Sequence, residues 1–259
     1  MYSSPAVAEI VPTIQGEIRV GEPVILVRLN GCNYHCPWCD TKYTWINKSK
    51  EIPQLTDDDI DAVLDEFKKY PKINKILLTG GEPLLYANQD KFYELLNIEN
   101  FNILHIETNG SLLNTPDFHI SNWSGYTIIN ISPKFEQIPD SEYEAYINIV
   151  KKFVYDQWVP NVFDLDMNLK FVYNKKNESK ILNMVADFED VFGTSNNIHV
   201  MSQTPDLSEL RSTYIPMEIN QILINNDLET IKFCMKHGFN FTPRFHTYLF
   251  HGDRKEMSE

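Results

Sequence analysis

The sequence predicts an α/β protein of one domain, built around a mostly parallel sheet that forms a barrel or partial barrel. Short apolar, β-branched segments alternate along the chain with segments whose apolar residues recur at helical spacing. About six such units fit into the 259 residues, and an α/β barrel commonly reaches about 250 residues as a single domain. No linker or internal repeat divides the chain. We therefore expect one domain over residues 1–259.

The elements of the first half follow from local patterns. The apolar run at 24–29 predicts a buried strand that leads into a cysteine-rich loop. Thr56 can cap a helix that has acidic residues at its positively polarised N-terminus, and its apolar side chains share one face: Ile60, Val63, Leu64 and Phe67. A strand at 76–78 ends at a glycine pair, and a helix with Phe92, Leu95 and Leu96 precedes a strand at 103–106.

The second half continues the alternation. Strands are predicted at 127–131, 169–173 and 198–201, with a helix after Asp140 and another around Ile181 to Phe188. The last helix runs from Pro216 to His237 and stops at Gly238, because a residue without Cβ suits a left-handed cap. Loops after strand ends carry the chemistry of parallel α/β folds. Here those loops read GCNYHCPWCDT, TGGEP, ETNG and SPK.

Composition excludes several classes of function. With 36 acidic and 23 basic residues the net charge is −13, so most of the surface repels a phosphate backbone, and we expect no direct nucleic-acid partner. The N-terminus lacks the basic start and apolar stretch of a secretory signal, and no window reaches the roughly 18 apolar residues of a spanning helix. We therefore expect no membrane partner.

Three of the four cysteines, Cys32, Cys36 and Cys39, lie within eight residues as Cys-x3-Cys-x2-Cys. Such a cluster indicates a metal site in a reducing compartment, so we expect a cytoplasmic protein. Three thiolates on a [4Fe-4S] cluster leave one iron open, whereas structural zinc requires four ligands. Zinc completed by His35, or three unconnected thiols, remain alternatives. Cys234, in the last helix, is expected to serve packing.

These cysteines, together with Gly80-Gly81-Glu82-Pro83 after the next strand, resemble the radical S-adenosylmethionine (radical SAM) superfamily. The resemblance implies a partial (β/α)6-type barrel. It also implies that the amino and carboxylate groups of S-adenosylmethionine chelate the open iron, and that reductive cleavage gives a 5′-deoxyadenosyl radical. The GGEP-type loop would hold the methionyl amino group.

Further motifs in the first half of the chain narrow the resemblance from the superfamily to the family of 7-carboxy-7-deazaguanine synthases. The matching segments are EIVPTIQGE at 9–17, Gly21, Pro23, VRLNGCN at 27–33, CDT at 39–41, Trp45, ETNG at 107–110 and SPK at 132–134. The family converts 6-carboxy-5,6,7,8-tetrahydropterin into 7-carboxy-7-deazaguanine with loss of ammonia, in queuosine and 7-deazapurine biosynthesis. The resemblance therefore implies a small pterin substrate, an electron donor such as flavodoxin, and a homodimer.

The resemblance assigns roles to individual residues of this chain. The substrate would contact Ile14, Gln15, Gly16, Arg28, Thr108 and His246, with residues 1–23 as the substrate-contacting segment. An amide suits a pterin edge and an arginine fork suits its carboxylate. The Thr41 hydroxyl would contact Mg²⁺, whose coordination the substrate carboxylate and waters would complete. S-adenosylmethionine would lie against Trp38, Cys39, Asp40, Gly80, Gly81, Glu82, Gly110, Ser132, Pro133, Lys134 and Gln203.

The chain departs from the family pattern at two places. Ile18 follows Glu17 where relatives have glycine, and residues 247–259 form a charged tail beyond His246. Two other functions stay open at this point. A glycyl-radical activase shares the cysteine loop but acts on a protein partner, and a zinc-stabilised module would have no catalysis.

Overall fold

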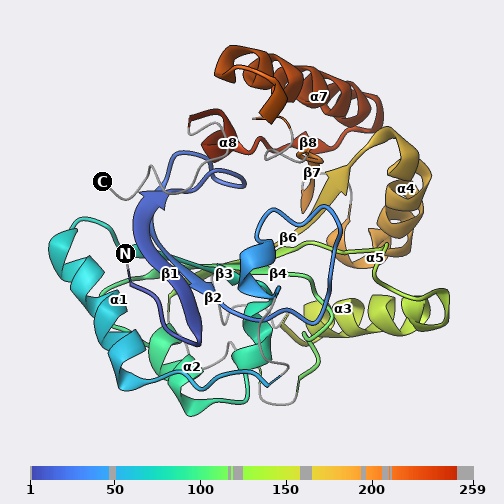
Figure 1. The fold of residues 1–259 in the computed structure, drawn as a ribbon. Coiled ribbons are helices and arrows are strands. Elements are labelled where there is room, and N and C mark those ends of the chain that lie inside the picture. The colour runs from blue at the N-terminus through green and yellow to red at the C-terminus, as the bar shows by residue number, and fades with distance from the viewer. Residues whose placement is uncertain are drawn as a thin grey trace.

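The computed structural model describes residues 2–46, 51–115, 118, 125–157, 165–193, 197–205, 210 and 212–249, the last range without the side chains of His246 and Leu249. One curved sheet holds eight strands in chain order (Figure 1). They are β1 Val7–Ile14, β2 Pro23–Leu29, β3 Lys75–Gly80, β4 Ile103–Thr108, β5 Tyr126–Ile131, β6 Leu165–Tyr173, β7 Ile198–Ser202 and β8 Asn240–Phe241. Only β1 runs antiparallel to its neighbour, and β2 to β8 are parallel. The expected mostly parallel partial barrel is therefore confirmed.

The helices lie around the outside of the sheet, as Figure 1 shows. The α-helices are α1 Asp57–Lys69, α2 Asp90–Leu96, α3 Tyr143–Gln157, α4 Glu178–Asp187, α5 Glu189–Phe192, α7 Pro216–His237 and α8 Phe245–Leu249. Short 3-10 helices cover Lys42–Thr44, Pro83–Tyr86, Asp140–Glu142 and Lys175–Asn177. In the described part of the chain, no helix is both long enough and apolar enough to span a membrane.

Local signals correctly placed the start of α1 and both ends of α7. The Thr56 hydroxyl accepts a hydrogen bond from the Asp59 amide at 3.3 Å, while the Asp59 carboxylate accepts the Thr56 amide, which completes a capping box for α1. Helix α7 ends at Gly238, whose φ of 75° is left-handed. Two strands went unpredicted. Pro12 lies inside β1, which tolerates it as the edge strand, and β8 has only two residues.

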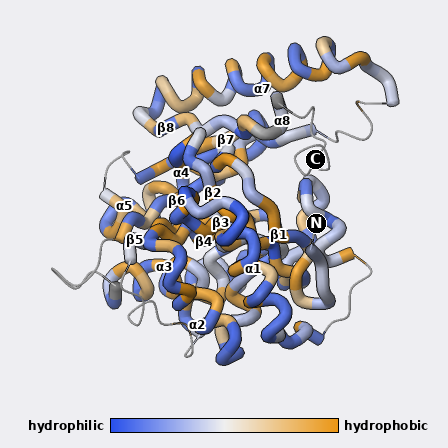
Figure 2. Tube along the Cα trace, turned by 90° about the vertical axis from the view of Figure 1, so that its left-hand side faces the viewer, coloured by the Kyte–Doolittle hydropathy of each residue, from blue (hydrophilic) through white to orange (hydrophobic). Residues whose placement is uncertain are grey.

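Alternation along the strands separates a packed outer face from an inner face. In β2, Ile25, Val27 and Leu29 are fully buried in the core, whereas Leu26 and Arg28 line an interior cavity. The same period of two places Ile76 and Leu78 of β3 in the core. Figure 2 shows hydrophobic residues concentrated on the strands inside the molecule. The sheet thus packs against its helices outward and presents functional side chains inward.

The sheet does not close on itself in the described part of the chain, because no pairing joins β1 to β8. The segment after β8 lies across this open edge. The Thr242 amide donates to the Val200 carbonyl at 3.0 Å, and the Phe245 amide donates to the Gly16 carbonyl at 2.8 Å. The C-terminal segment therefore connects the last strands to the loop after β1.

Candidate active site

A cavity of about 220 Å³ opens inside the partial barrel. Most of the predicted site residues line it: Ile14, Gln15, Gly16, Arg28, Cys32, Cys36, Trp38, Cys39, Asp40, Thr41, Gly80, Gly81, Thr108, Ser132 and Lys134. Glu82, Gly110, Pro133 and Gln203 do not line it. The backbone of His246 belongs to α8, and its side chain lies outside the described residues. Segments far apart in sequence thus converge on one cavity.

The three clustered cysteines are free thiols facing this cavity. The Tyr34 amide donates to Cys32 Sγ at 3.4 Å, and both the Thr41 amide and the Trp45 indole N–H donate to Cys39 Sγ at 3.4 Å. Burial raises the pKa of Cys32 to about 12 and that of Cys36 to about 11. Thiolates here therefore need a bound cation, and the N–H donors suit negatively charged sulfur. The loop fits an iron–sulfur cluster.

The surroundings of His35 do not favour the zinc alternative. Its ring packs edge-on against Trp45, with centroids 4.9 Å apart. Among the residues that the structure describes, no three His, Cys, Asp or Glu side chains form a group suited to one metal ion. A structural zinc ion requires four converging ligands, and this loop offers no such arrangement in its described part.

The glycine pair at the end of β3 lets the loop after β3 approach the cysteine loop closely. The Gly81 amide donates to the Leu29 carbonyl at 3.1 Å, and the Glu82 amide donates to the Gly31 carbonyl at 2.9 Å. A Cβ on Gly81 would lie 1.9 Å from the Gly31 oxygen, which is sterically impossible. Only glycine permits this close approach of backbones, so the pair fixes the loop directly beneath the cysteine loop.

Glu82 does not line the cavity and is fully buried. Its carboxylate accepts hydrogen bonds from the Thr108 hydroxyl at 2.7 Å, the Asn109 amide at 2.7 Å and the Leu84 amide at 3.1 Å. Burial raises its pKa, and these donors oppose the shift. Glu82 therefore braces the loop after β4 from below.

The loop after β4 is also tied to the cysteine loop. The Asn109 side-chain amide donates to Asn33 Oδ1 at 2.9 Å, and Asn33 donates to the Ser111 hydroxyl at 2.8 Å. Gly110 completes this loop behind the cavity, where the Tyr146 hydroxyl donates to the Asn109 carbonyl at 2.8 Å. The ETNG segment is thus held from both sides.

The loop after β5 contributes Ser132 and Lys134. The Lys134 ammonium donates to the Ser132 hydroxyl at 2.5 Å and lies 5.7 Å from the ring centroid of Trp38, a cation–π distance. Burial and the nearby charge of Lys170 lower the pKa of Lys134. Gln203, after β7, instead accepts a hydrogen bond from Asn174 at 2.5 Å, away from the main cavity.

The opposite wall of the cavity comes from β1 and β2. Arg28 is buried, and its Nε donates to the Glu9 carboxylate, which also accepts the Tyr43 hydroxyl at 3.0 Å. Gln15 is buried as well. Its Oε1 accepts the Glu17 amide at 3.2 Å, whereas its Nε2 has no hydrogen-bond partner among the described residues. A buried amide donor without a partner suits a ligand acceptor.

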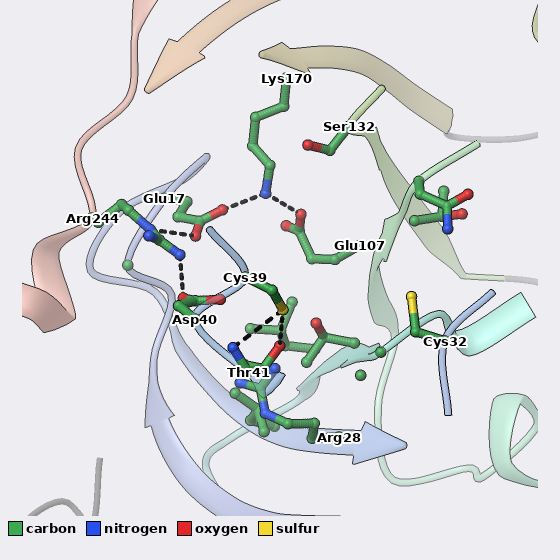
Figure 3. A pocket seen from close by; sticks show the side chains of 18 of the residues that line it. Glu17, Arg28, Cys32, Cys39, Asp40, Thr41, Glu107, Ser132, Lys170 and Arg244 are labelled. Carbon is green, nitrogen blue, oxygen red and sulfur yellow. Dashed lines mark hydrogen bonds and ion pairs between the residues drawn. The ribbon is translucent and has the colours of Figure 1, made fainter. Parts of the chain in front are cut away.

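Five charged side chains of the lining were not among the predicted site residues: Glu9, Glu17, Glu107, Lys170 and Arg244. The Lys170 ammonium donates to both Glu17 and Glu107, and Arg244 faces Glu17 and Asp40 (Figure 3). Lys170 had a detectable signal, because it is a charge inside the apolar strand LKFVY. Arg244 lies two residues before His246, which was expected at the site, but it was given no role of its own.

The charges inside the cavity balance, although the chain carries −13 overall. Four carboxylates of the lining, Glu9, Glu17, Asp40 and Glu107, accompany four cations, Arg28, Lys134, Lys170 and Arg244. Burial alone would lower the pKa of Lys170, but the two carboxylates beside it raise it above its ordinary value. Burial raises the pKa of Glu107, and Lys170 opposes this shift. Arg28, Lys170 and Arg244 are thus each held by carboxylates of the lining.

Comparison with known proteins agrees with this geometry. Residues 26–206 match the radical SAM superfamily. The chain is 25% identical over 245 residues to a 7-carboxy-7-deazaguanine synthase of Halobacterium salinarum, covering 93% of this chain and 88% of that one. It is 31% identical over 199 residues to the Buchnera aphidicola enzyme of the same name, covering 70% and 85%. The crystal structure of QueE from Escherichia coli shares the fold, with a TM-score of 0.53, 17% identity, and coverage of 93% and 94%.

Proposed function

Because the chain belongs to the radical SAM superfamily and, within it, to the family of 7-carboxy-7-deazaguanine synthases, we propose that it converts 6-carboxy-5,6,7,8-tetrahydropterin into 7-carboxy-7-deazaguanine with loss of ammonia. The observation that carries this proposal is the shared cavity. The cysteine loop, the loops after β3, β4 and β5, and the β1–β2 wall all line it. Residues that would bind cofactor and residues that would bind substrate thus face one another.

Cys32, Cys36 and Cys39 would hold a [4Fe-4S] cluster. Such a cluster, when reduced, would supply together with S-adenosylmethionine the radical chemistry that the reaction needs. Trp38, Asp40, Gly80, Gly81, Ser132 and Lys134 surround the space beside the cysteines, and we assign them to the cofactor. Glu82 and Gly110 would act through the loops that they shape. Pro133 and Gln203 do not line the cavity and complete the proposed set of cofactor residues.

The substrate would lie between this cofactor side and the β1–β2 wall. Arg28, held by Glu9, presents a guanidinium to a carboxylate, and the unpartnered Gln15 amide would donate to a pterin acceptor. Ile14 and Gly16 complete this wall, and residues 1–23 form the segment that carries them. Thr108, at the end of β4, also lines the cavity and is a further proposed substrate contact. His246 remains a proposed substrate contact. Enclosure by these walls would keep water from the reacting carbon.

Mg²⁺ would bind at Thr41, which is buried and lines the cavity beside Asp40. The substrate carboxylate would supply the main negative ligand, and the ion would orient it. A Thr41→Val variant should retain the cluster but need a higher Mg²⁺ concentration for half-maximal activity. An unchanged Mg²⁺ dependence would remove Thr41 from the site.

The test of function uses the anaerobically reconstituted, reduced protein with S-adenosylmethionine, 6-carboxytetrahydropterin and Mg²⁺. We expect 7-carboxy-7-deazaguanine and ammonia in equal amounts. Formation of 5′-deoxyadenosine without the deazapurine would contradict the proposed reaction while leaving S-adenosylmethionine cleavage in place. A colourless reconstituted protein would contradict both.

A homodimer is supported by an exposed apolar stripe on α7. Met217, Ile224, Leu228 and Met235 share one face of the helix and are 74%, 42%, 49% and 79% exposed. Light scattering of the purified protein should give twice the chain mass, and Leu228→Glu should give the monomer. An unaltered dimer in that variant would place the interface elsewhere.

A flavodoxin-type donor in the cytoplasm would reduce the cluster. Cys32 and Cys39 are only partly buried, so a cluster held there lies within reach of a docked protein. All four cysteines are free thiols, which suits a reducing compartment. Reduced flavodoxin should therefore support turnover in place of a chemical reductant.

A further inference from the structure

Arg244 lies in the segment that crosses the open edge of the sheet, between β8 and α8. We propose that Arg244 is a positioning residue that holds the cysteine loop and the loop after β1 in one fixed relation, and thereby aligns cofactor with substrate. This inference rests on the proposed function. The sequence analysis assigned Arg244 no role of its own, and its importance follows from where the fold places it.

The guanidinium of Arg244 joins three separate parts of the chain. Its two terminal nitrogens donate to Asp40, in the cysteine loop, and to the Thr204 hydroxyl, after β7. Its Nε lies 3.8 Å from Glu17 Oε1, after β1. The side chain is only 15% exposed, so solvent screens these contacts weakly. Figure 3 shows Arg244 between Glu17 and Asp40 at the cavity wall.

Each of these partners is next to a group that the reaction would use. Asp40 lies between Cys39, a proposed cluster ligand, and Thr41, the proposed Mg²⁺ contact. Glu17 follows Gln15 and Gly16 and shares Lys170 with Glu107. The guanidinium of Arg244 therefore connects the C-terminal end of the cysteine loop to the loop after β1.

The backbone around Arg244 is itself fixed. The Phe245 amide donates to the Gly16 carbonyl at 2.8 Å, and the Thr247 amide and hydroxyl donate to the Arg244 carbonyl at 2.9 and 2.7 Å. Arginine suits such a junction because its five N–H donors have a rigid planar arrangement, whereas lysine offers a single flexible charge. A shift of about 1 Å in the relative position of reacting groups is enough to lower a rate roughly 100-fold.

The experiment compares Arg244→Gln with a matched control, Arg19→Gln. Arg19 holds the same β1–β2 loop through Tyr126 and Asp166, both at 3.0 Å, but it does not line the cavity. The readout is the ratio of 5′-deoxyadenosine formed to deazapurine formed, which does not depend on the fraction of active protein. We expect a several-fold higher ratio in Arg244→Gln, a wild-type ratio in Arg19→Gln, and partial recovery in Arg244→Lys.

Hydrogen exchange of the reconstituted proteins supplies a second readout that is independent of turnover. Arg244→Gln should raise exchange both in the cysteine loop and at residues 15–17, whereas Arg19→Gln should leave the cysteine loop protected. If the wild type makes no deazapurine, the proposed function fails, and the exchange comparison still tests the Arg244 connection. If Arg244→Gln does not fold, Arg244→Lys is measured instead, by the product ratio and by hydrogen exchange. A wild-type ratio with unchanged exchange in the folded variant would overturn the proposal.

Discussion

The hydroxyl of Thr108, at the end of β4, donates a 2.7 Å hydrogen bond to the carboxylate of Glu82, which is fully buried just after the neighbouring strand β3. The same carboxylate accepts the backbone amide of Asn109 at 2.7 Å. A residue of the GGEP segment thus sets the shape of the ETNG segment. The two motifs act as one structural unit beneath the cavity.

Replacing Glu82 with Gln should destabilise this unit. The amide has one acceptor oxygen instead of two, so either the Thr108 hydroxyl or the Asn109 amide is left facing an N–H group. An unsatisfied buried donor costs about 1–3 kcal/mol, offset in part because a buried charge is removed. Urea unfolding should show a loss of this size, with faster hydrogen exchange at Asn109. Equal stability of the two proteins would contradict the bracing role.

Trp45→Phe should make the reduction potential of the bound cluster more negative. The indole N–H donates to Cys39 Sγ at 3.4 Å, and hydrogen bonds to cluster sulfurs stabilise the reduced, more negatively charged state. A redox titration followed by electron paramagnetic resonance measures the shift. Trp38→Phe is the control, because its N–H donates to Glu136 at 2.5 Å and not to sulfur. Identical potentials in wild type and Trp45→Phe would exclude the effect.

Arg28→Lys should weaken use of the pterin substrate without loss of the cluster. The variant keeps the positive charge near Glu9 but loses the planar fork that pairs with a carboxylate. A hydrogen bond to a charged group contributes about 1.5–3 kcal/mol, so kcat/KM for the pterin should fall about 10- to 100-fold. Steady-state kinetics and iron analysis check this. An unaltered KM and kcat would place the substrate carboxylate elsewhere.

Cys36→Ala should abolish both S-adenosylmethionine cleavage and deazapurine formation, because two thiolates do not hold a site-differentiated cubane. Cys234→Ala provides the matched control. Cys234 is buried in α7, and burial raises the pKa of its thiol to about 11, so it is an inert packing residue. The control should retain the brown colour and iron content of the wild type. A Cys36→Ala protein with full iron content would reject the assigned ligand set.

Acid should destabilise the fold through His105, which is fully buried in β4. Burial lowers the pKa of its imidazole to about 4, although the Glu22 carboxylate 3.4 Å away favours the charged form. An unfolded histidine titrates near about 6.5. Between these values the unfolded chain binds more protons, so the free energy of unfolding falls as pH decreases from about 6.5 to about 4. Urea unfolding of His105→Gln should show a shallower pH slope in this range, and equal slopes would exclude His105.

Much of the fold was readable because its signals are local. Thr56 and Gly238 mark helix ends by cap chemistry that needs no tertiary contact, and both ends are confirmed. Strand β2 was readable from its apolar run alone. By contrast, β1 carries Pro12, and the pairing that makes it a strand comes from β2. Whether residues 7–14 form a strand therefore depends on pairing with β2, which the local sequence of β1 does not reveal.

The candidate site shows the same division. Cys32, Cys36 and Cys39 are readable because their spacing is itself the signal. Glu82 stays a proposed member of the cofactor site; it does not line the cavity, and its carboxylate is held by three donors that sequence motifs do not reveal. Arg244 and Asp40 are 204 positions apart in the sequence, and only the tertiary fold brings them together. Contacts made by tertiary closure leave no local pattern in the sequence.

The contact between Phe245 and Gly16 also fixes an order of events during synthesis. Translation proceeds from the N-terminus, so Arg244 and Phe245 emerge after every strand of the sheet, including β8 at Asn240–Phe241. The part of the cavity lining that Arg244 supplies is consequently the last to be synthesised. A nascent chain thus carries all three cysteines before it has this residue, and a chain truncated before Arg244 has the ligands but lacks this part of the lining.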